Sequence, residues 1–179
     1  MKNNGFRDCF GILDTCVTFE CAYTEEEFRE MKKRGYTGIL FGYLDANWDG
    51  NFSRLDNYAY TSVFPDMMPA DEIEKNRAEL TRRLACAQKA GLKVWMSVRG
   101  PLTETDLRTV SAETAEKYKA YFGPGGDKWG GSGMHPLCLS IPEIRQRYRE
   151  LIRDAVKSFP GIDGFSFFGG DSYSLVCDE

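Results

Sequence analysis

The chain has 179 residues, of which 42% are hydrophobic and 28% are charged, values typical of a globular protein that can bury a core. Its formal net charge of −4 argues against nucleic acid or an anionic membrane as a partner, and no apolar run approaches the roughly 20 residues of a membrane span. The first residues lack the apolar core of a signal peptide. A cytoplasmic location is therefore the default expectation, although a removed leader would leave the same sequence and the location stays unknown.

The cysteines and the histidine give no support for a metal site. The six cysteines contain no CxxC pair, which favours reduced, buried thiols over a disulfide framework. His135 and Cys138 are spaced like metal ligands, but His135 is the only histidine and no second pair accompanies it. We therefore expect no metal and no cofactor.

The first strand and helix are predicted near the amino terminus. A short apolar run at residues 8–13 predicts a strand. Thr24 and Glu27 then form a capping-box sequence, in which the hydroxyl accepts from backbone N–H groups and the glutamate reaches back. The helix that follows has Phe28 on its apolar side, and Gly35 suits the left-handed conformation that ends many helices.

The second strand and helix repeat this order. An apolar run at residues 36–44 predicts a strand, and a helix follows Pro69 after a long loop at 45–69. Gly91 ends this helix, and a third apolar strand begins at once over residues 92–98. The apolar stripe of the helix consists of Ile73, Leu80, Leu84 and Ala87.

The third helix has the strongest sequence signals. Ser140 and Glu143 match a capping box, and Pro142 lies in the first turn, where its missing N–H costs nothing. A fourth apolar strand follows at residues 162–168. Apolar positions recur at helical spacing, with charges on the opposite face: Ile144, Tyr148, Leu151, Ile152, Ala155, Val156 and Phe159.

Continuous apolar strands separated by helices predict an α/β fold with a parallel sheet buried on both faces. The long loops at 45–69 and 100–139, the second with a small helix near 111–122, follow strands and so lie where α/β barrels and open sheets bind ligands. No glycine-rich phosphate loop follows the first strand, which favours a (β/α)₈ barrel over a doubly wound sheet.

The number of predicted elements indicates half of such a barrel. Four strands and three helices account for residues 1–179, whereas closing a barrel takes roughly 200 residues or more. We therefore expect a single partial domain, about the first four strands of a TIM (β/α)₈ barrel, as a fragment of something longer. The unpaired edges of a half barrel predict that the chain self-associates.

Polar and aromatic side chains follow the ends of the predicted strands. Aromatic rings stack on the C–H face of a sugar, while carboxylates and arginine bind its hydroxyls, so this mixture predicts a carbohydrate site. Glycoside cleavage needs one carboxyl group as the acid and a second as base or nucleophile. Asp171 is the predicted catalytic carboxylate because it ends an apolar strand after two glycines. The candidate substrate-binding residues are Asp14, Tyr43, Asp45, Trp48, Arg99 and Tyr173.

The end of the sequence resembles TIM-barrel glycoside hydrolases. Residues 138–145 and 161–165 look like their third helix and fourth strand, and Phe168-Gly169-Gly170-Asp171 is similar to the hexosaminidase-type signature, in which Gly-Gly-Asp-Glu ends strand four. The resemblance implies that Asp171 orients the acetamido group of the substrate and that the next residue is the general acid. Ser172 stands at that glutamate position, so Asp178 or Glu179 is the candidate replacement.

Three functions remain open at this point. The leading interpretation is a glycoside hydrolase-like barrel that cleaves glycosidic bonds by carboxylate acid/base chemistry in its full-length form. Ser172 favours instead a barrel that binds glycans without cleaving them. The third is an unrelated TIM-barrel enzyme acting on phosphorylated metabolites. The usual phosphate site of such barrels follows strands seven and eight, which are not among the four strands predicted here, so this function stays open.

Overall fold

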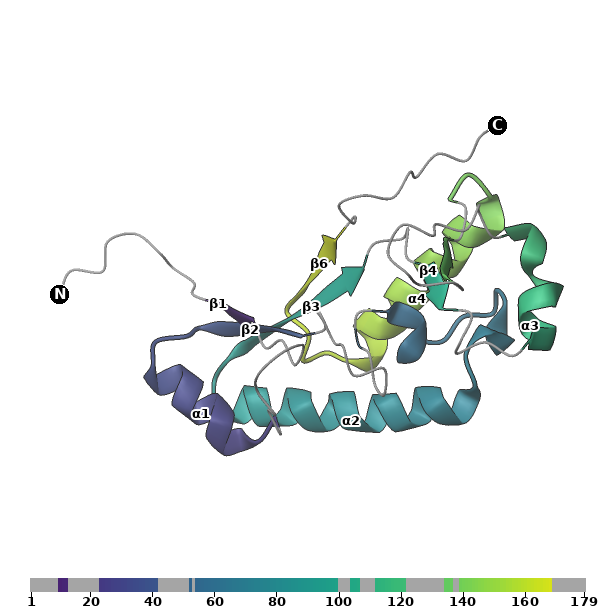
Figure 1. Ribbon diagram of the computed structural model, residues 1–179. Helices are drawn as coiled ribbons and strands as arrows, with labels where there is room; N and C mark the ends of the chain where they lie inside the picture. The colour runs from purple at the N-terminus through teal and green to yellow at the C-terminus, as the bar shows by residue number, and fades with distance from the viewer. Residues whose placement is uncertain are drawn as a thin grey trace.

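The computed structural model describes residues 10–12, 23–41, 52, 54–99, 104–106, 112–121, 134–136 and 139–168. The main sheet has four strands, and each pair of neighbours is parallel (Figure 1). In spatial order the strands are β1 (Phe10–Ile12), β2 (Gly38–Phe41), β3 (Lys93–Arg99) and β6 (Gly164–Phe168). All four predicted strands are confirmed, and so is the α/β fold with a parallel sheet.

Three helices connect these strands, and their ends follow the sequence signals at two of them. The helices are α1 (Glu25–Lys33), α2 (Ala70–Lys89) and α4 (Pro142–Ser158). The Glu27 amide donates to the Thr24 hydroxyl over 3.2 Å, and the Thr24 amide donates to the Glu27 carboxylate over 2.8 Å, so the predicted capping box is confirmed. Gly35 and Gly91 have φ of +96° and +72°, the left-handed conformation that glycine favours.

The start of α4 differs from the prediction. The helix begins at Pro142, one residue later than the predicted capping box implies; its N-cap is Ile141 and no side chain caps it, so the predicted capping box is wrong. The carbonyls of Leu139 and Ser140 instead accept from the Arg145 guanidinium at 2.7 and 2.8 Å.

Two side chains of α4 lie on the opposite face of the helix from the one predicted. Val156 was expected in the apolar stripe but is 56% exposed, whereas Arg147 was expected on the charged face but is 2% exposed. The remaining predicted stripe residues are buried or packed against the core. The helix therefore buries a narrower apolar stripe than predicted and adds one arginine to it.

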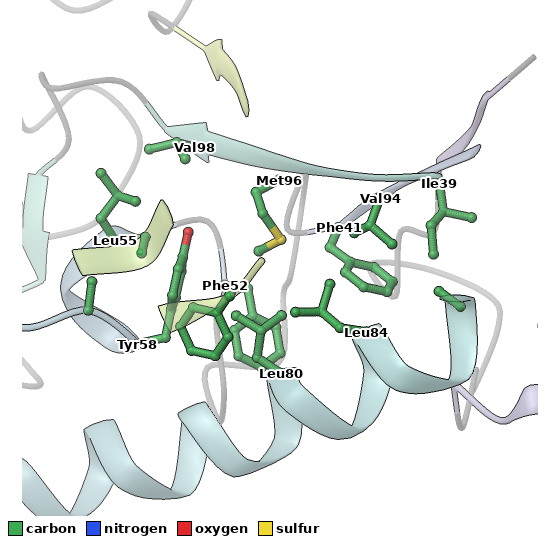
Figure 2. Close-up of a cluster of buried hydrophobic side chains, with 14 of the residues drawn as sticks. Ile39, Phe41, Phe52, Leu55, Tyr58, Leu80, Leu84, Val94, Met96 and Val98 are labelled. Atoms are coloured by element: carbon green, nitrogen blue, oxygen red, sulfur yellow. The ribbon is translucent and has the colours of Figure 1, made fainter. Parts of the chain in front are cut away.

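The main hydrophobic core lies between the sheet and the helices. Figure 2 shows Ile39 and Phe41 of β2 and Met96 of β3 on the side of the sheet that faces Leu80 and Leu84 of α2. Because side chains alternate along a strand, the residues at the intervening positions of β2 and β3 point to the opposite face of the sheet. α1 and α2 both lie below the sheet in the view of Figure 1.

The long connections contain more structure than the sequence predicted. Residues 54–68 include two short 3₁₀ helices, η1 (Leu55–Asn57) and η2 (Pro65–Met67), and bury Leu55, Tyr58 and Met67. The second connection confirms the expected small helix near 111–122. It also contains an antiparallel pair of short strands that was not predicted. Its elements are β4 (Glu104–Asp106), α3 (Ala112–Lys117), η3 (Lys119–Tyr121) and β5 (Met134–Pro136).

Candidate functional site

The carboxyl ends of β3 and β6 meet at one edge of the sheet. The two strands pair in parallel from Trp95 opposite Gly164 to Arg99 opposite Phe168, so both end at the same level. The sequence Gly169-Gly170-Asp171 follows β6 directly, and the 100–139 connection follows β3. In parallel α/β folds this edge is the usual place for a ligand.

Most of the predicted site residues lie outside the described part of the chain. Arg99 is the exception, and what is known of it is that its backbone ends β3 opposite Phe168. The structure therefore brings no two predicted site side chains together, and each assignment stays a prediction. The seven predicted residues outside the described ranges are Asp14, Tyr43, Asp45, Trp48, Asp171, Tyr173 and Glu179.

Trp95 is a partly exposed aromatic residue that the sequence did not single out, and it lies four residues before the carboxyl end of β3, away from the edge described above. It lies on β3, opposite Leu40 on one side and Gly164 on the other, and is 37% exposed. A Cβ atom added to Gly164 would lie 3.0 Å from the Trp95 indole, so the ring lies against the backbone of β6. Lys93, Trp95 and Ser97 alternate with three apolar residues, a pattern that indicates two different faces of the strand, whereas the prediction was one continuous apolar run.

The end of the connection after β2 is fixed by a buried ionic cluster. Asp56 accepts from Arg54 at 3.0 Å and from Arg147 of α4 at 3.1 Å, and all three side chains are at most 12% exposed. Burial alone would raise the pKa of Asp56, but the two guanidinium groups outweigh it and lower the pKa to about 2. The carboxylate therefore stays charged, and Arg147 also donates to the carbonyls of Val63 and Phe64.

Hydrogen bonds to α2 continue this attachment. Asn76 donates to the Asn57 carbonyl at 3.0 Å, and Arg77 donates to the Tyr58 carbonyl at 2.9 Å. Residues 57 and 58 are thereby held to α2 through their backbone carbonyls, which a change of their own side chains would leave in place.

Two carboxylates of α4 hold the next residues. Asp154 accepts from the Tyr60 amide, and Glu150 accepts from the Thr61 hydroxyl and from the Ser62 amide and hydroxyl. Hydrogen bonds, first that from the Gln146 amide, lower the pKa of Glu150 to about 2. The described end of the loop predicted at 45–69 is therefore held against α4 by side-chain hydrogen bonds.

The hydroxyl of Tyr58 is buried and has no hydrogen-bond partner within the described part of the chain. Figure 2 shows it directed from η1 toward β3, beside Leu55. Burial and the nearby Asp56 carboxylate raise the pKa of Tyr58 well above its usual range, so the phenol stays protonated and is a hydrogen-bond donor. It faces the core and not solvent, so it contributes no accessible catalytic group.

The described residues offer no other centre for chemistry. They contain no group of three or more histidine, cysteine, aspartate and glutamate side chains that would hold a metal ion. Cys86 is a free thiol packed against the core, and the other five cysteines lie outside the described ranges. Among the same residues, no helix is both long and apolar enough to cross a membrane.

Comparison with known proteins does not assign the chain to a family. No protein-family model matches it, and no curated protein sequence matches it significantly.

Proposed function

We propose that the chain forms about the first four strands of a TIM barrel that binds and hydrolyses carbohydrate, in the manner of glycoside hydrolases. The fold supports this in one main respect. β3 and β6 run in parallel and end together at Arg99 and Phe168, so the sequence after each strand starts from a common edge. The Gly-Gly-Asp sequence that resembles the hexosaminidase signature follows β6 at this edge.

In the proposed mechanism Asp171 is the carboxylate closest to the reaction. It orients an acetamido group or stabilises positive charge that develops on the sugar ring, while a second carboxyl group protonates the leaving oxygen as the glycosidic bond breaks. Water completes the hydrolysis by forming the new bond to the anomeric carbon, and its proton returns to the second carboxylate. Glu179 is the candidate for that second group, because Ser172 has no acidic proton to give. Arg99, Asp14 and Asp45 would bind hydroxyls, and Tyr43, Trp48 and Tyr173 would line the sugar ring.

The test is the variant Asp171→Asn in the full-length protein, assayed with chromogenic N-acetylhexosaminides and a panel of oligosaccharides. We expect kcat to fall by about 100-fold or more, with the thermal midpoint unchanged, because the amide keeps the shape of the side chain but loses its charge. Asp71→Asn is the matched control, since Asp71 is exposed in the first turn of α2. Hydrolysis that is unaffected by Asp171→Asn would refute the assignment.

A second candidate function is glycan binding without hydrolysis. The observation in its favour is Ser172 at the position where the resembling enzymes have their acid. Calorimetric titration with the same oligosaccharides separates the two proposals. Saturable heat without released reducing ends supports the binding function, and release of reducing ends excludes it.

A further inference from the structure

The exposed face of α4 carries a row of four cations. Arg145, Arg149, Arg153 and Lys157 follow one another at intervals of four residues, and all four are exposed. Residues four apart lie on the same side of a helix and about 6 Å apart along its axis. We call these four side chains the α4 cationic face.

The acidic residues of α4 do not neutralise this face. Glu150 lies three residues before Arg153, and Asp154 lies three residues before Lys157, a spacing at which ion pairs form on a helix. Their carboxylates are engaged with residues 60–62 and with Arg77 instead. Within the described part of the chain, Arg149, Arg153 and Lys157 make no ion pair.

All but one of the exposed cations of α1 and α2 form ion pairs, which makes α4 different; the exception, Lys32 of α1, donates to the Gly91 carbonyl. On α1, Arg29 pairs with Glu25, and on α2, Lys75 pairs with Glu72. Like charges four residues apart repel one another, so the α4 cationic face contains three unfavourable neighbours in a row. Carboxylates supplied from outside would relieve this repulsion.

An apolar residue lies within the same face. Val156 follows Arg153 by three residues and Arg149 by seven, and its side chain is 56% exposed. Nucleic acid or a sulfated polysaccharide would satisfy the cations but would gain little from valine. A protein partner would use both, because arginine pairs with carboxylates through two parallel hydrogen bonds and a neighbouring apolar side chain would cover the valine.

We propose that the α4 cationic face docks an acidic helix of a partner protein. The helix would present glutamate or aspartate at every fourth residue over about three turns, matching the 6 Å spacing of the cations, with one apolar side chain against Val156. The proposal rests on α4 alone and is independent of the carbohydrate function.

The test uses a fluorescent synthetic helical peptide with glutamate at every fourth position and one leucine beside that row, titrated with the full chain. We expect binding that weakens steeply with salt and that falls at least about tenfold in Arg149→Glu. The same substitution places a carboxylate between Arg145 and Arg153, so we expect Tm to rise by roughly 1–3 °C. Lys75→Glu on α2 makes the same change in net charge and should leave peptide binding unchanged.

The combination of weaker binding with higher Tm distinguishes a docking face from a merely structural one. Absence of peptide binding, equal loss in Lys75→Glu, or equal binding of a peptide with the same composition in scrambled order would overturn the proposal. So would binding of heparin or duplex DNA through Arg149 in the absence of peptide binding.

Discussion

Arg147 shows how one side chain joins parts of the chain that are distant in sequence. It lies on α4 but donates to Asp56, 91 residues earlier, and to the carbonyls of Val63 and Phe64. A buried guanidinium is tolerable only when it is paired and its hydrogen bonds are made, and here both conditions are met. The sequence predicted the charged residues of this helix, Arg147 among them, on the solvent face. That prediction was wrong for Arg147 because helical spacing cannot reveal a buried carboxylate supplied by a remote loop.

The Asp56 carboxylate should therefore be necessary for stability. Asp56→Asn leaves Arg54 and Arg147 buried without a counter-ion, and we expect the free energy of unfolding at pH 7 to fall by about 3 kcal/mol. Urea unfolding followed by circular dichroism measures this. The exposed Asp71→Asn control should change stability by less than about 0.5 kcal/mol, and an equal effect in both variants would contradict the role of the cluster.

The same carboxylate makes a specific contribution to pH dependence. Its pKa is lowered from 3.8 to about 2 on folding, so its stabilisation is fully present above pH 3.8 and is lost as the pH falls through 2. Asp56→Asn should show a smaller loss of stability than the wild type over this window. The pKa values of Glu150 and Glu79 are lowered from 4.5 to about 2, so these two residues account for a loss of stability at low pH that the wild type and Asp56→Asn share.

Helices and strands were predictable where their signals are local. The capping box at Thr24, the glycines that end α1 and α2, and the apolar runs of the four strands all depend on residues within a few positions of one another. The β4–β5 pair was missed because its three-residue strands depend on pairing across a long connection. The capping box at Ser140 was wrong because the N-cap is Ile141, one residue later, so Ser140 and Glu143 do not occupy the N-cap and N3 positions.

Gly91 gives a prediction for a helix end. A Cβ atom at this position would meet only Lys32 Cε, at 4.0 Å, so the cost of Gly91→Ala comes from the positive φ and should be about 1 kcal/mol. Gly161→Ala is the control: its φ is not positive, and its Cβ would contact the Gln88 amide, the far end of a flexible side chain. We expect denaturant midpoints to show the larger loss for Gly91→Ala, and the reverse order would be inconsistent with backbone strain at Gly91.

At the scale of the whole molecule, the sequence predicted the parallel order of the strands but not how the connections pack. Alternating helices and apolar strands imply a parallel sheet on general grounds. The attachment of residues 54–64 to α2 and α4 depends on contacts between remote side chains, which no local pattern reveals. For the site, the sequence identifies candidate residues near the ends of strands, and the described structure supports the common edge but not the individual roles.

Self-association is the last prediction, and it follows from the layers of the fold. Within the described part of the chain, β1 and β6 each pair with one neighbour and so form the edges of the sheet (Figure 1). α1 and α2 lie on one side, while Trp95 is 37% exposed on the other. Unpaired strand edges form hydrogen bonds with strands of other chains, and exposed apolar faces pack against them. We therefore expect concentration-dependent association in sedimentation velocity.

Trp95→Glu should weaken this association, because a charge on the sheet face opposes packing against a second apolar surface. Val156→Glu is the matched control, since Val156 is more exposed but lies on α4. We expect the Trp95 variant to shift toward the monomer and the Val156 variant to behave as the wild type. A single sharp monomer boundary for the wild type at all concentrations would contradict the prediction, and a shift in the Val156 variant alone would move the contact from the sheet to α4.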